Sequence, residues 1–234
     1  MAINHAHFQG LLCITAYYAK VGVISPVLAN IYLHYALDLW FEKKVKGRAM
    51  LIRYADDFVV AFQFKQDAER FYKVLPRRHN KFGLEVAPEK TRLMRFSRFH
   101  PGRKRNFQFL GFEFYWSQDV RGEPRLRRRT ARKKQKSAMS EFYQWIKFNR
   151  SKPLREFMPI LKRKLIGFRN YFGLSDNSHS LAHLDRYVLH SLYKWLNRRS
   201  QRRSYNWSSF LDMLRYFQFA PMRVRKINIL VDWY

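Results

Sequence analysis

The feature that most constrains the fold is a pair of adjacent carboxylates between two short apolar runs. Asp56 and Asp57 follow the apolar residues 50–52 and precede the apolar residues 59–62, and each run has the length of a β-strand. Two such runs around a short acidic connection predict a β-hairpin with the carboxylates at its turn. Like charges this close raise the free energy of the ionised state unless a cation lies nearby.

A divalent cation would stabilise this turn. Asp oxygens are the hard ligands that Mg²⁺ prefers, and Mg²⁺ takes its remaining ligands from water and substrate phosphates. Two such ions about 4 Å apart serve in-line phosphoryl transfer in polymerases and nucleases. The alternative is an ordinary acidic turn solvated at the surface, since Asp is common in turns. The carboxylate pair by itself leaves both interpretations open.

The neighbouring segments favour the first interpretation. Residues 54–57, YADD, resemble the catalytic hairpin of reverse transcriptases. Three further segments resemble those that flank this hairpin in the group II intron reverse transcriptase/maturase family. They are residues 22–34 (GVISPVLANIYLH), 83–91 (GLEVAPEKT) and 109–114 (FLGFEF). The four segments follow the family's order. Residues 153–156 (PLRE), 167–173 (GFRNYFG) and 194–201 (KWLNRRSQ) also resemble its thumb and maturase region, so the resemblance covers roughly residues 20 to 234.

The resemblance implies RNA-directed DNA synthesis, in which a primer 3′-hydroxyl attacks the α-phosphate of a nucleotide. Asp56 and Asp57 would be catalytic and would hold the cofactor Mg²⁺. Lys90 would be catalytic by neutralising or protonating the departing pyrophosphate, and a solvated turn lysine is the alternative. The residues expected to contact primer and template are Tyr54, Ala55, Leu110 and Gly111.

The chain departs from the family pattern upstream of these segments. The family has Pro-Gln-Gly where this chain has AKV at residues 19–21. The family also carries a third carboxylate on a palm strand upstream of residue 25, whereas residues 1–19 contain no Asp or Glu. We therefore expect a truncated protein, the C-terminal half of the family's fold, with an incomplete two-metal site.

We expect an α+β fold in two parts. Residues 20–115 would form a partial reverse-transcriptase palm, an antiparallel sheet with helices, and residues 1–19 an unmatched leader. In the palm, Leu28, Ile31, Tyr35 and Leu39 recur at helical spacing and predict the core face of an amphipathic helix that ends near Lys44. The polar residues 116–127 would be a linker. Four apolar stripes separated by breakers then predict a thumb/maturase bundle of about four helices over residues 128–234.

The charge balance indicates a polyanionic partner. The net charge is +29 with a pI near 10.6, which favours nucleic acid first and an anionic membrane surface second. Nine of the sixteen residues 121–136 are Lys or Arg, which predicts phosphate contacts or, alternatively, a solvated helix face. The resemblance adds that the helical half grips intron RNA, with guanidinium groups on phosphates and rings on unpaired bases. The residues expected to bind RNA are Arg127, Arg128, Arg129, Arg132, Lys133, Lys134, Arg169, Tyr171, Arg198, Arg199, Arg202 and Arg203.

The expected partners are therefore structured intron RNA, an RNA template with a DNA primer, and deoxynucleoside triphosphates where the site is active. No run is long and apolar enough to predict a membrane span, and a single cysteine excludes a disulfide framework, so we expect a soluble intracellular protein.

A homodimer could complete the catalytic site. The main alternative function is that of a non-catalytic RNA-binding splicing factor. Two further alternatives are an inactive relic without a stable fold and a basic protein that binds a membrane surface. We expect RNA binding with little or no polymerisation.

Overall fold

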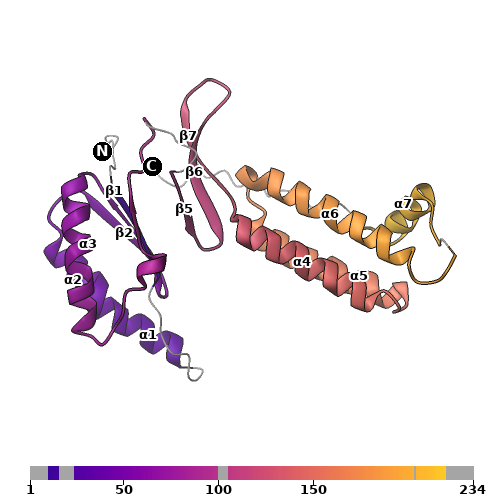
Figure 1. The fold of residues 1–234 in the computed structure, drawn as a ribbon, viewed down its shortest axis with the longest axis horizontal. Helices are drawn as coiled ribbons and strands as arrows, with labels where there is room; N and C mark the ends of the chain where they lie inside the picture. Colours follow the sequence, from indigo (N-terminus) through magenta and orange to yellow (C-terminus); the bar gives the residue numbers. More distant parts are fainter. Residues whose placement is uncertain (1–9, 16–23, 100–104, 203, 220–234) are drawn as a thin grey trace. The chain divides into compact units, whose positions relative to one another are not determined.

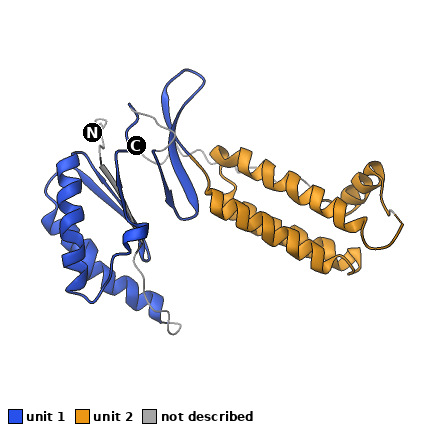
Figure 2. Cartoon of the chain, in the orientation of Figure 1, with its two compact units in different colours: residues 1–127 blue, residues 128–234 orange. Residues whose placement is uncertain are grey.

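The structure, a computed structural model, describes residues 10–15, 24–99, 105–202 and 204–219 (Figure 1). The chain divides into two compact units, residues 1–127 and residues 128–234 (Figure 2). Unit 1 combines helices with antiparallel sheets. Unit 2 begins with the last three residues of the final strand, 128–130, and its further elements are helices. The expected α+β fold, a partial palm followed by a helical bundle, is confirmed.

The main sheet of unit 1 has four strands. They are β1 (Gly10–Thr15), β2 (Ala49–Tyr54), β3 (Asp57–Phe62) and β4 (Arg92–Met94), in the spatial order β2-β3-β1-β4. The β2–β3 hairpin expected from the two apolar runs is confirmed, with Tyr54 paired to Asp57 next to the turn. Strand β1 is new, because it comes from the unmatched leader. It pairs antiparallel with both β3 and β4, so the leader supplies an inner strand.

Helices cover one face of this sheet. A continuous helical segment consists of α1 (Ser25–Leu33), the π-turn η1 (His34–Asp38) and α2 (Leu39–Lys44), and α3 (Lys65–Asn80) follows the hairpin. The core between helices and sheet is aromatic and aliphatic. Alternate residues of β3 point into it, as the two-residue period of a strand requires. The main side chains of this core are Leu37, Phe41, Phe58, Val60, Phe62, Phe71 and Leu75.

The orientation of α1 differs from the sequence-based expectation. Leu28, Ile31 and Tyr35, three of the four residues expected on the core face of the helical segment, are 59%, 52% and 61% exposed. The buried side chains are instead Leu33 of α1 and Ala36 and Leu37 of η1. This helix is apolar on both sides, so periodicity identifies a helix but does not tell which of its faces meets the sheet.

A second sheet packs against the opposite face of β3. It contains β5 (Asn106–Phe109), β6 (Phe112–Gln118) and β7 (Pro124–Thr130) in the order β5-β6-β7. Val59 and Ala61 of β3 meet Phe96 and the aromatic residues of β5 and β6. Strand β3 is therefore buried on both faces, which explains why its sequence is a continuous apolar run.

The expected linker, residues 116–127, is part of a β-hairpin. The Asp119 side chain accepts hydrogen bonds from the backbone N–H groups of Arg121 (2.8 Å) and Glu123 (2.9 Å). Gly122 has a φ of +82°, which glycine adopts without steric cost. The polar residues that resemble a linker therefore build the tight connection between β6 and β7.

Unit 2 is a bundle built on four helices. They are α4 (Arg132–Asn149), α5 (Leu154–Phe172), α6 (Ser178–Leu196) and α7 (Trp207–Tyr216). Each buries part of its apolar stripe, although Trp207 at the start of α7 is 45% exposed. Their shared core includes Phe142, Phe157, Leu165, Leu192 and Phe210. The expectation of about four helices is confirmed. No helix in the described ranges is long and apolar enough to cross a membrane.

A buried histidine makes the stability of unit 1 dependent on pH. His79 of α3 is 1% exposed, and its ring stacks on Phe58 with the centroids 6.3 Å apart. Burial lowers the pKa of His79 below its ordinary value of 6.5, although a hydrogen bond to the Leu75 carbonyl partly opposes this. Below pH 6.5 the unfolded chain therefore binds a proton that the folded chain does not.

The free energy of unfolding of unit 1 is therefore expected to fall as the pH is lowered from 7 to 5. The His79 contribution should not exceed about 1.4 kcal/mol per pH unit, the limit that the binding of one proton sets. Urea unfolding at several pH values measures it. The His79→Leu variant should lose this part of the pH dependence, and an unchanged profile would contradict the assignment.

Candidate functional site

The acidic turn joins β2 to β3 in unit 1. Ala55 has a φ of +54°, a left-handed conformation that non-glycine residues adopt at a steric cost. Asp56 and Asp57 are partly exposed, and Tyr54 is 65% exposed. The two carboxylates are thus adjacent on a short, conformationally restricted turn and open to a ligand.

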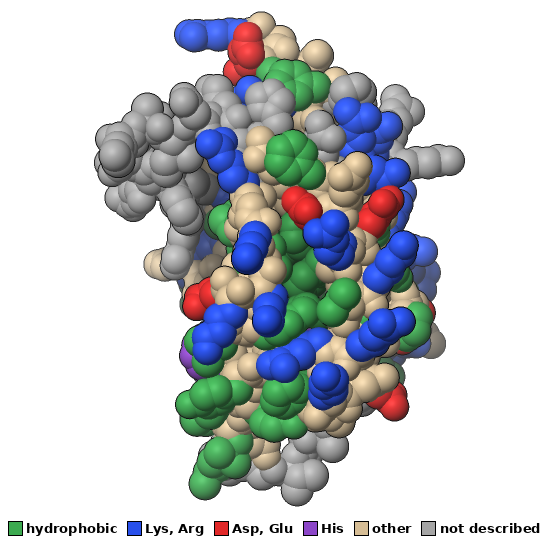
Figure 3. All heavy atoms as spheres, turned by 90° about the vertical axis from the view of Figure 1, so that its left-hand side faces the viewer, with side chains coloured by type: hydrophobic (Ala, Val, Ile, Leu, Met, Phe, Trp, Pro, Cys, Tyr) green, Lys and Arg blue, Asp and Glu red, His purple; other side chains and the backbone are tan. Residues whose placement is uncertain are grey.

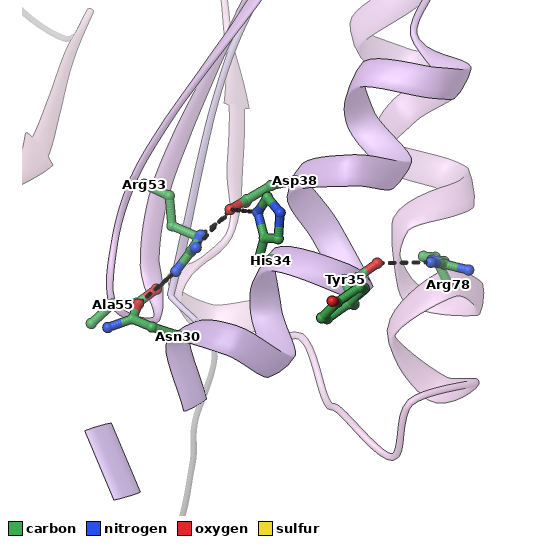
Figure 4. Close-up of polar contacts among 7 residues, drawn as sticks. All are labelled: Asn30, His34, Tyr35, Asp38, Arg53, Ala55 and Arg78. Atoms are coloured by element: carbon green, nitrogen blue, oxygen red, sulfur yellow. Dashed lines mark hydrogen bonds and ion pairs between the residues drawn. The ribbon is translucent and has the colours of Figure 1, made fainter. Parts of the chain in front are cut away.

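The guanidinium group of Arg53 holds this turn against the helical layer (Figure 4). It donates two hydrogen bonds to the Asp38 carboxylate, at 2.9 and 2.6 Å. The same group donates to the Asn30 side-chain oxygen (2.8 Å) and to the Ala55 carbonyl (3.0 Å). Because Ala55 immediately precedes the two carboxylates, this network restrains the position of the turn.

A second arginine braces the helix that carries Asp38. Arg78 of α3 donates to the Ala36 carbonyl at 2.9 Å and to the Tyr35 carbonyl at 3.2 Å (Figure 4). Both carbonyls belong to η1, where the π-helical pattern departs from ordinary α-helical hydrogen bonding. The helix, the turn and α3 are thus tied together by two arginines.

This network was not predicted from the sequence. Asn30, Asp38 and Arg53 belong to helix and strand segments 15 to 23 residues apart. The only local signal is the arginine directly before the YADD segment. No periodic pattern links it to a particular carboxylate, because the contact depends on how α1 and η1 pack on the sheet.

The residues at the turn fit part of a magnesium site. The carboxylates of Asp56 and Asp57 could hold the ion, with water and phosphate oxygens as its further ligands. In the described part of the chain, no group of three His, Cys, Asp or Glu side chains is placed to hold a metal ion. The strand beside Asp57 is β1, whose Thr15 is its backbone pairing partner, and β1 contains no acidic residue.

Lys90 lies at the same end of the main sheet as the acidic turn. It ends the 3₁₀ turn η2 (Pro88–Lys90), just before β4. The register pairs Arg92 with Cys13 and Thr15 with Asp57, so η2 is two strands from the carboxylates. With about 4.8 Å between neighbouring strands, this is a separation of about 10 Å between strand axes. Lys90 is exposed at this position.

Leu110 and Gly111 form the two-residue turn of the β5–β6 hairpin. Their φ angles are +51° and +77°, the combination that type I′ hairpin turns require. A leucine in this region is unusual, because its side chain crowds the backbone. Since Phe109 pairs with Phe112, Gly111 stands in the tight turn between two paired strands.

Replacing Gly111 by alanine is expected to lower the stability of unit 1 by about 1 kcal/mol, because a Cβ disfavours positive φ. Thermal unfolding of the Gly111→Ala variant measures the effect. Gly167→Ala, on an exposed helical position with open space around it, is the matched control and should not destabilise the protein. An equal loss in both variants would contradict the role of the turn.

The basic residues expected to bind RNA fall into two groups on the helical unit and the strand before it. The first group surrounds the start of α4: Arg127, Arg128 and Arg129 are on β7, and Arg132, Lys133 and Lys134 are in the first turn. Arg169 and Tyr171 belong to it, because α5 runs antiparallel to α4, with Phe168 against Phe142 and Phe157 against Trp145. Tyr171 is 53% exposed. One member of the group, Arg128, is paired with Asp176 at 3.6 Å.

The second group follows α6. Arg198 and Arg202 are exposed, whereas Arg199 is partly buried and donates to the Lys152 carbonyl at 3.2 Å. Arg203 lies outside the described residues. Helices α4 and α6 run parallel, since Gln135 bonds to Ser180 near their starts and Lys194 bonds to Tyr143 further along. The two groups are therefore at opposite ends of α4, an 18-residue helix about 27 Å long.

An antiparallel sheet covered by helices on one face, with an acidic hairpin turn at one end, is the palm of a reverse transcriptase. Residues 22–114 match the family model described as reverse transcriptase (RNA-dependent DNA polymerase). Residues 135–210 match the one described as group II intron, maturase-specific domain. The chain belongs to the group II intron reverse transcriptase/maturase family, a family that generally uses Mg²⁺.

Among solved structures, the chain is similar to telomerase from Candida albicans in complex with a TWJ fragment of telomeric RNA. The sequence identity is 11% and the TM-score is 0.32; the match covers 86% of this chain and 35% of that one. The chain thus spans about a third of the length of that protein. No curated protein matches the sequence.

Proposed function

We propose that this chain is an RNA-binding protein of the group II intron family whose helical unit grips structured intron RNA. The observation that carries the proposal is that the maturase-specific segment lies in a unit with its own hydrophobic core and a strongly cationic surface. A folded unit can present its cations in a fixed arrangement, as recognition of a folded RNA requires.

The charge supports a polyanionic ligand. The chain has 46 Lys and Arg against 17 Asp and Glu. The face of the molecule in Figure 3 carries many Lys and Arg side chains and few acidic ones. An excess of this size attracts nucleic acid through phosphate contacts and counterion release.

Electrophoretic mobility shift with a structured group II intron RNA tests the proposal. We expect binding that weakens steeply with salt and that is tighter for the intron RNA than for a DNA duplex of equal length. Equal affinity for the intron RNA and the DNA duplex would mean that the chain attracts any polyanion and does not recognise a folded RNA. Absence of binding to either would contradict the proposal.

The second candidate function is RNA-directed DNA synthesis. The observation that favours it is the turn with Asp56 and Asp57, held by Arg53 through the Ala55 carbonyl. In this function Asp56 and Asp57 would hold Mg²⁺, which supplies charge neutralisation at the reacting phosphate. Lys90 would face the pyrophosphate, and the Leu110–Gly111 turn and Tyr54 would position primer and template. The nucleotide substrate would be a deoxynucleoside triphosphate.

Primer extension on an RNA template separates the two candidates. With Mg²⁺ and all four deoxynucleoside triphosphates, we expect this chain by itself to bind the template without extending the primer. Among the described residues, no third metal-ligating side chain is grouped with Asp56 and Asp57. Extension that disappears in the Asp56→Asn variant would instead establish a complete site, with the missing ligand supplied from outside the described residues or by a second copy of the chain.

A further inference from the structure

Four cationic side chains surround one tryptophan at the end of the helical pair α4–α6. The charged groups of Lys147, Arg150, Lys194 and Arg198 lie 5.6, 5.0, 5.5 and 5.7 Å from the ring centroid of Trp195. Two come from the end of α4 and two from the end of α6, so the cluster depends on the packing of these helices. We call these five residues the Trp195 cluster.

The four cations make no ion pair with a carboxylate in the part of the chain that the structure describes. Arg150 donates to the Lys147 carbonyl at 3.2 Å, and Lys194 donates to the Tyr143 hydroxyl at 3.1 Å. The face of one aromatic ring attracts cations but does not neutralise four of them. The cluster therefore retains a local excess of positive charge.

Tyr143 adds to this environment. The hydrogen bond from Lys194 lowers the pKa of the Tyr143 phenol, and the charges of Lys194 and Lys147 act in the same direction. The phenol oxygen thus serves as the acceptor for one ammonium group. It leaves the remaining ammonium protons of Lys194 free to contact an anion.

We propose that the Trp195 cluster is a binding site for backbone phosphates of RNA. The proposal rests on the proposed RNA-binding function and adds a particular place on the helical unit. Trp195 is only 8% exposed, so its ring cannot stack on a base, whereas Lys194 and Arg198 are exposed. The site therefore reads the backbone and not the sequence, as phosphate contacts do.

The geometry also explains how this site would act together with the basic group at the start of α4. The Trp195 cluster lies at the other end of that helix, and an 18-residue helix spans about 27 Å. One folded RNA could contact both ends, and the phosphates at the two ends would fix its direction along the bundle. The helix dipoles also favour cations at the C-terminal ends of α4 and α6. Stabilisation of the two helices by these cations is the structural alternative to phosphate binding.

The test is the salt dependence of RNA binding by two variants that each lose four positive charges. The first is Lys147→Gln, Arg150→Gln, Lys194→Gln and Arg198→Gln. The matched control is Arg155→Gln, Lys162→Gln, Arg163→Gln and Arg186→Gln, four positions on α5 and α6 outside the cluster. The probe is the same structured intron RNA, titrated between 50 and 300 mM KCl.

We expect the cluster variant to bind more than tenfold more weakly near 0.1 M salt. The slope of log K against log salt should fall by about 3, since each lost phosphate contact removes about 0.7 to 0.9 from it. The control should change the slope by less than about 1. Should the fourfold variant not fold, the single variants Lys194→Gln and Arg198→Gln, both at exposed positions, should each lower the slope by about 0.7 to 0.9.

Three outcomes would overturn the inference. Equal slopes in the cluster variant and the control would show that weaker RNA binding results from the loss of net charge alone. The proposed RNA-binding function would then stand. No binding by the wild-type chain would overturn both. Binding to vesicles of anionic phospholipid that is lost in the cluster variant and not displaced by RNA would assign the cluster to a membrane surface.

Discussion

Replacing Asn177 by alanine is expected to lower the free energy of unfolding of unit 2 by about 3 kcal/mol, because buried polar partners lose their hydrogen bonds. Asn177 is fully buried between β7 and α6. Its side-chain oxygen accepts from the Thr130 backbone N–H at 2.7 Å. Its amide donates to the Thr130 hydroxyl at 2.7 Å and to the Phe172 carbonyl at 2.9 Å.

The cost arises from the groups left behind. In the alanine variant the buried Thr130 N–H loses its acceptor, and an unsatisfied buried group costs about 1 to 3 kcal/mol. The Thr130 hydroxyl also loses its donor, whereas the Phe172 carbonyl still accepts from the Leu174 N–H at 2.9 Å. Asn177→Asp keeps the acceptor and loses both donors, so it should also destabilise unit 2. Denaturant unfolding followed by circular dichroism measures both variants.

A matched control is Gln144→Ala on the exposed side of α4. Surface substitutions of this kind usually change stability by no more than about 0.5 kcal/mol. A loss of less than 1 kcal/mol for Asn177→Ala would mean that water replaces the missing hydrogen bonds, and the bracing role of Asn177 would be wrong.

The second large effect is expected at Arg53. Replacing it by methionine keeps much of the aliphatic stem and removes the guanidinium group, which contacts Asp38, Asn30 and Ala55. Breaking a buried ion pair costs about 3 to 5 kcal/mol, and the partial exposure of this pair reduces the expected loss to about 2 kcal/mol. The side chains of Arg53 and Asp38 are 14% and 22% exposed.

A double-mutant cycle isolates the interaction. Arg53→Met and Asp38→Leu should each destabilise unit 1, and the double variant should cost less than their sum by about 1 to 2 kcal/mol. The control is Arg48→Met, at an exposed position directly before β2. Additive effects would show that the two residues act independently.

Arg53 should also affect the acidic turn itself. Since its guanidinium group holds the Ala55 carbonyl, the amides of Ala55 and Asp56 should exchange hydrogen faster in Arg53→Met than in Arg48→Met. Lower global stability alone would speed exchange throughout unit 1. An increase confined to the turn therefore separates positioning of the carboxylates from general destabilisation.

Local elements were predictable from the sequence because their signals are local. The β2–β3 hairpin follows from two short apolar runs around an acidic turn, and the four stripes of unit 2 follow from helical periodicity. The β6–β7 hairpin was not predicted, because β7 is mostly charged and the polar residues around Asp119 and Gly122 resemble a linker as much as a turn. Strand β1 was not predicted either. Its short, mostly apolar segment forms a strand because β3 and β4 pair with it, and this pairing leaves no signal in the segment itself.

The candidate site was predictable only in part. The two carboxylates and most of the basic residues come from short motifs, and their roles stay predictions. The Arg53 network and the Trp195 cluster each join residues from separate segments. Such contacts have no fixed sequence spacing, because they depend on which helix faces meet.

The sequence by itself determined the family, the two-part α+β organisation and the acidic turn, because these reside in contiguous motifs, apolar periodicity and net charge. Only the tertiary structure decided which face of α1 meets the sheet, that the leader forms strand β1 beside Asp57, and which cations gather around Trp195. The physical reason is that α1 is apolar on both sides, and strand pairing and side-chain clusters depend on contacts between distant segments.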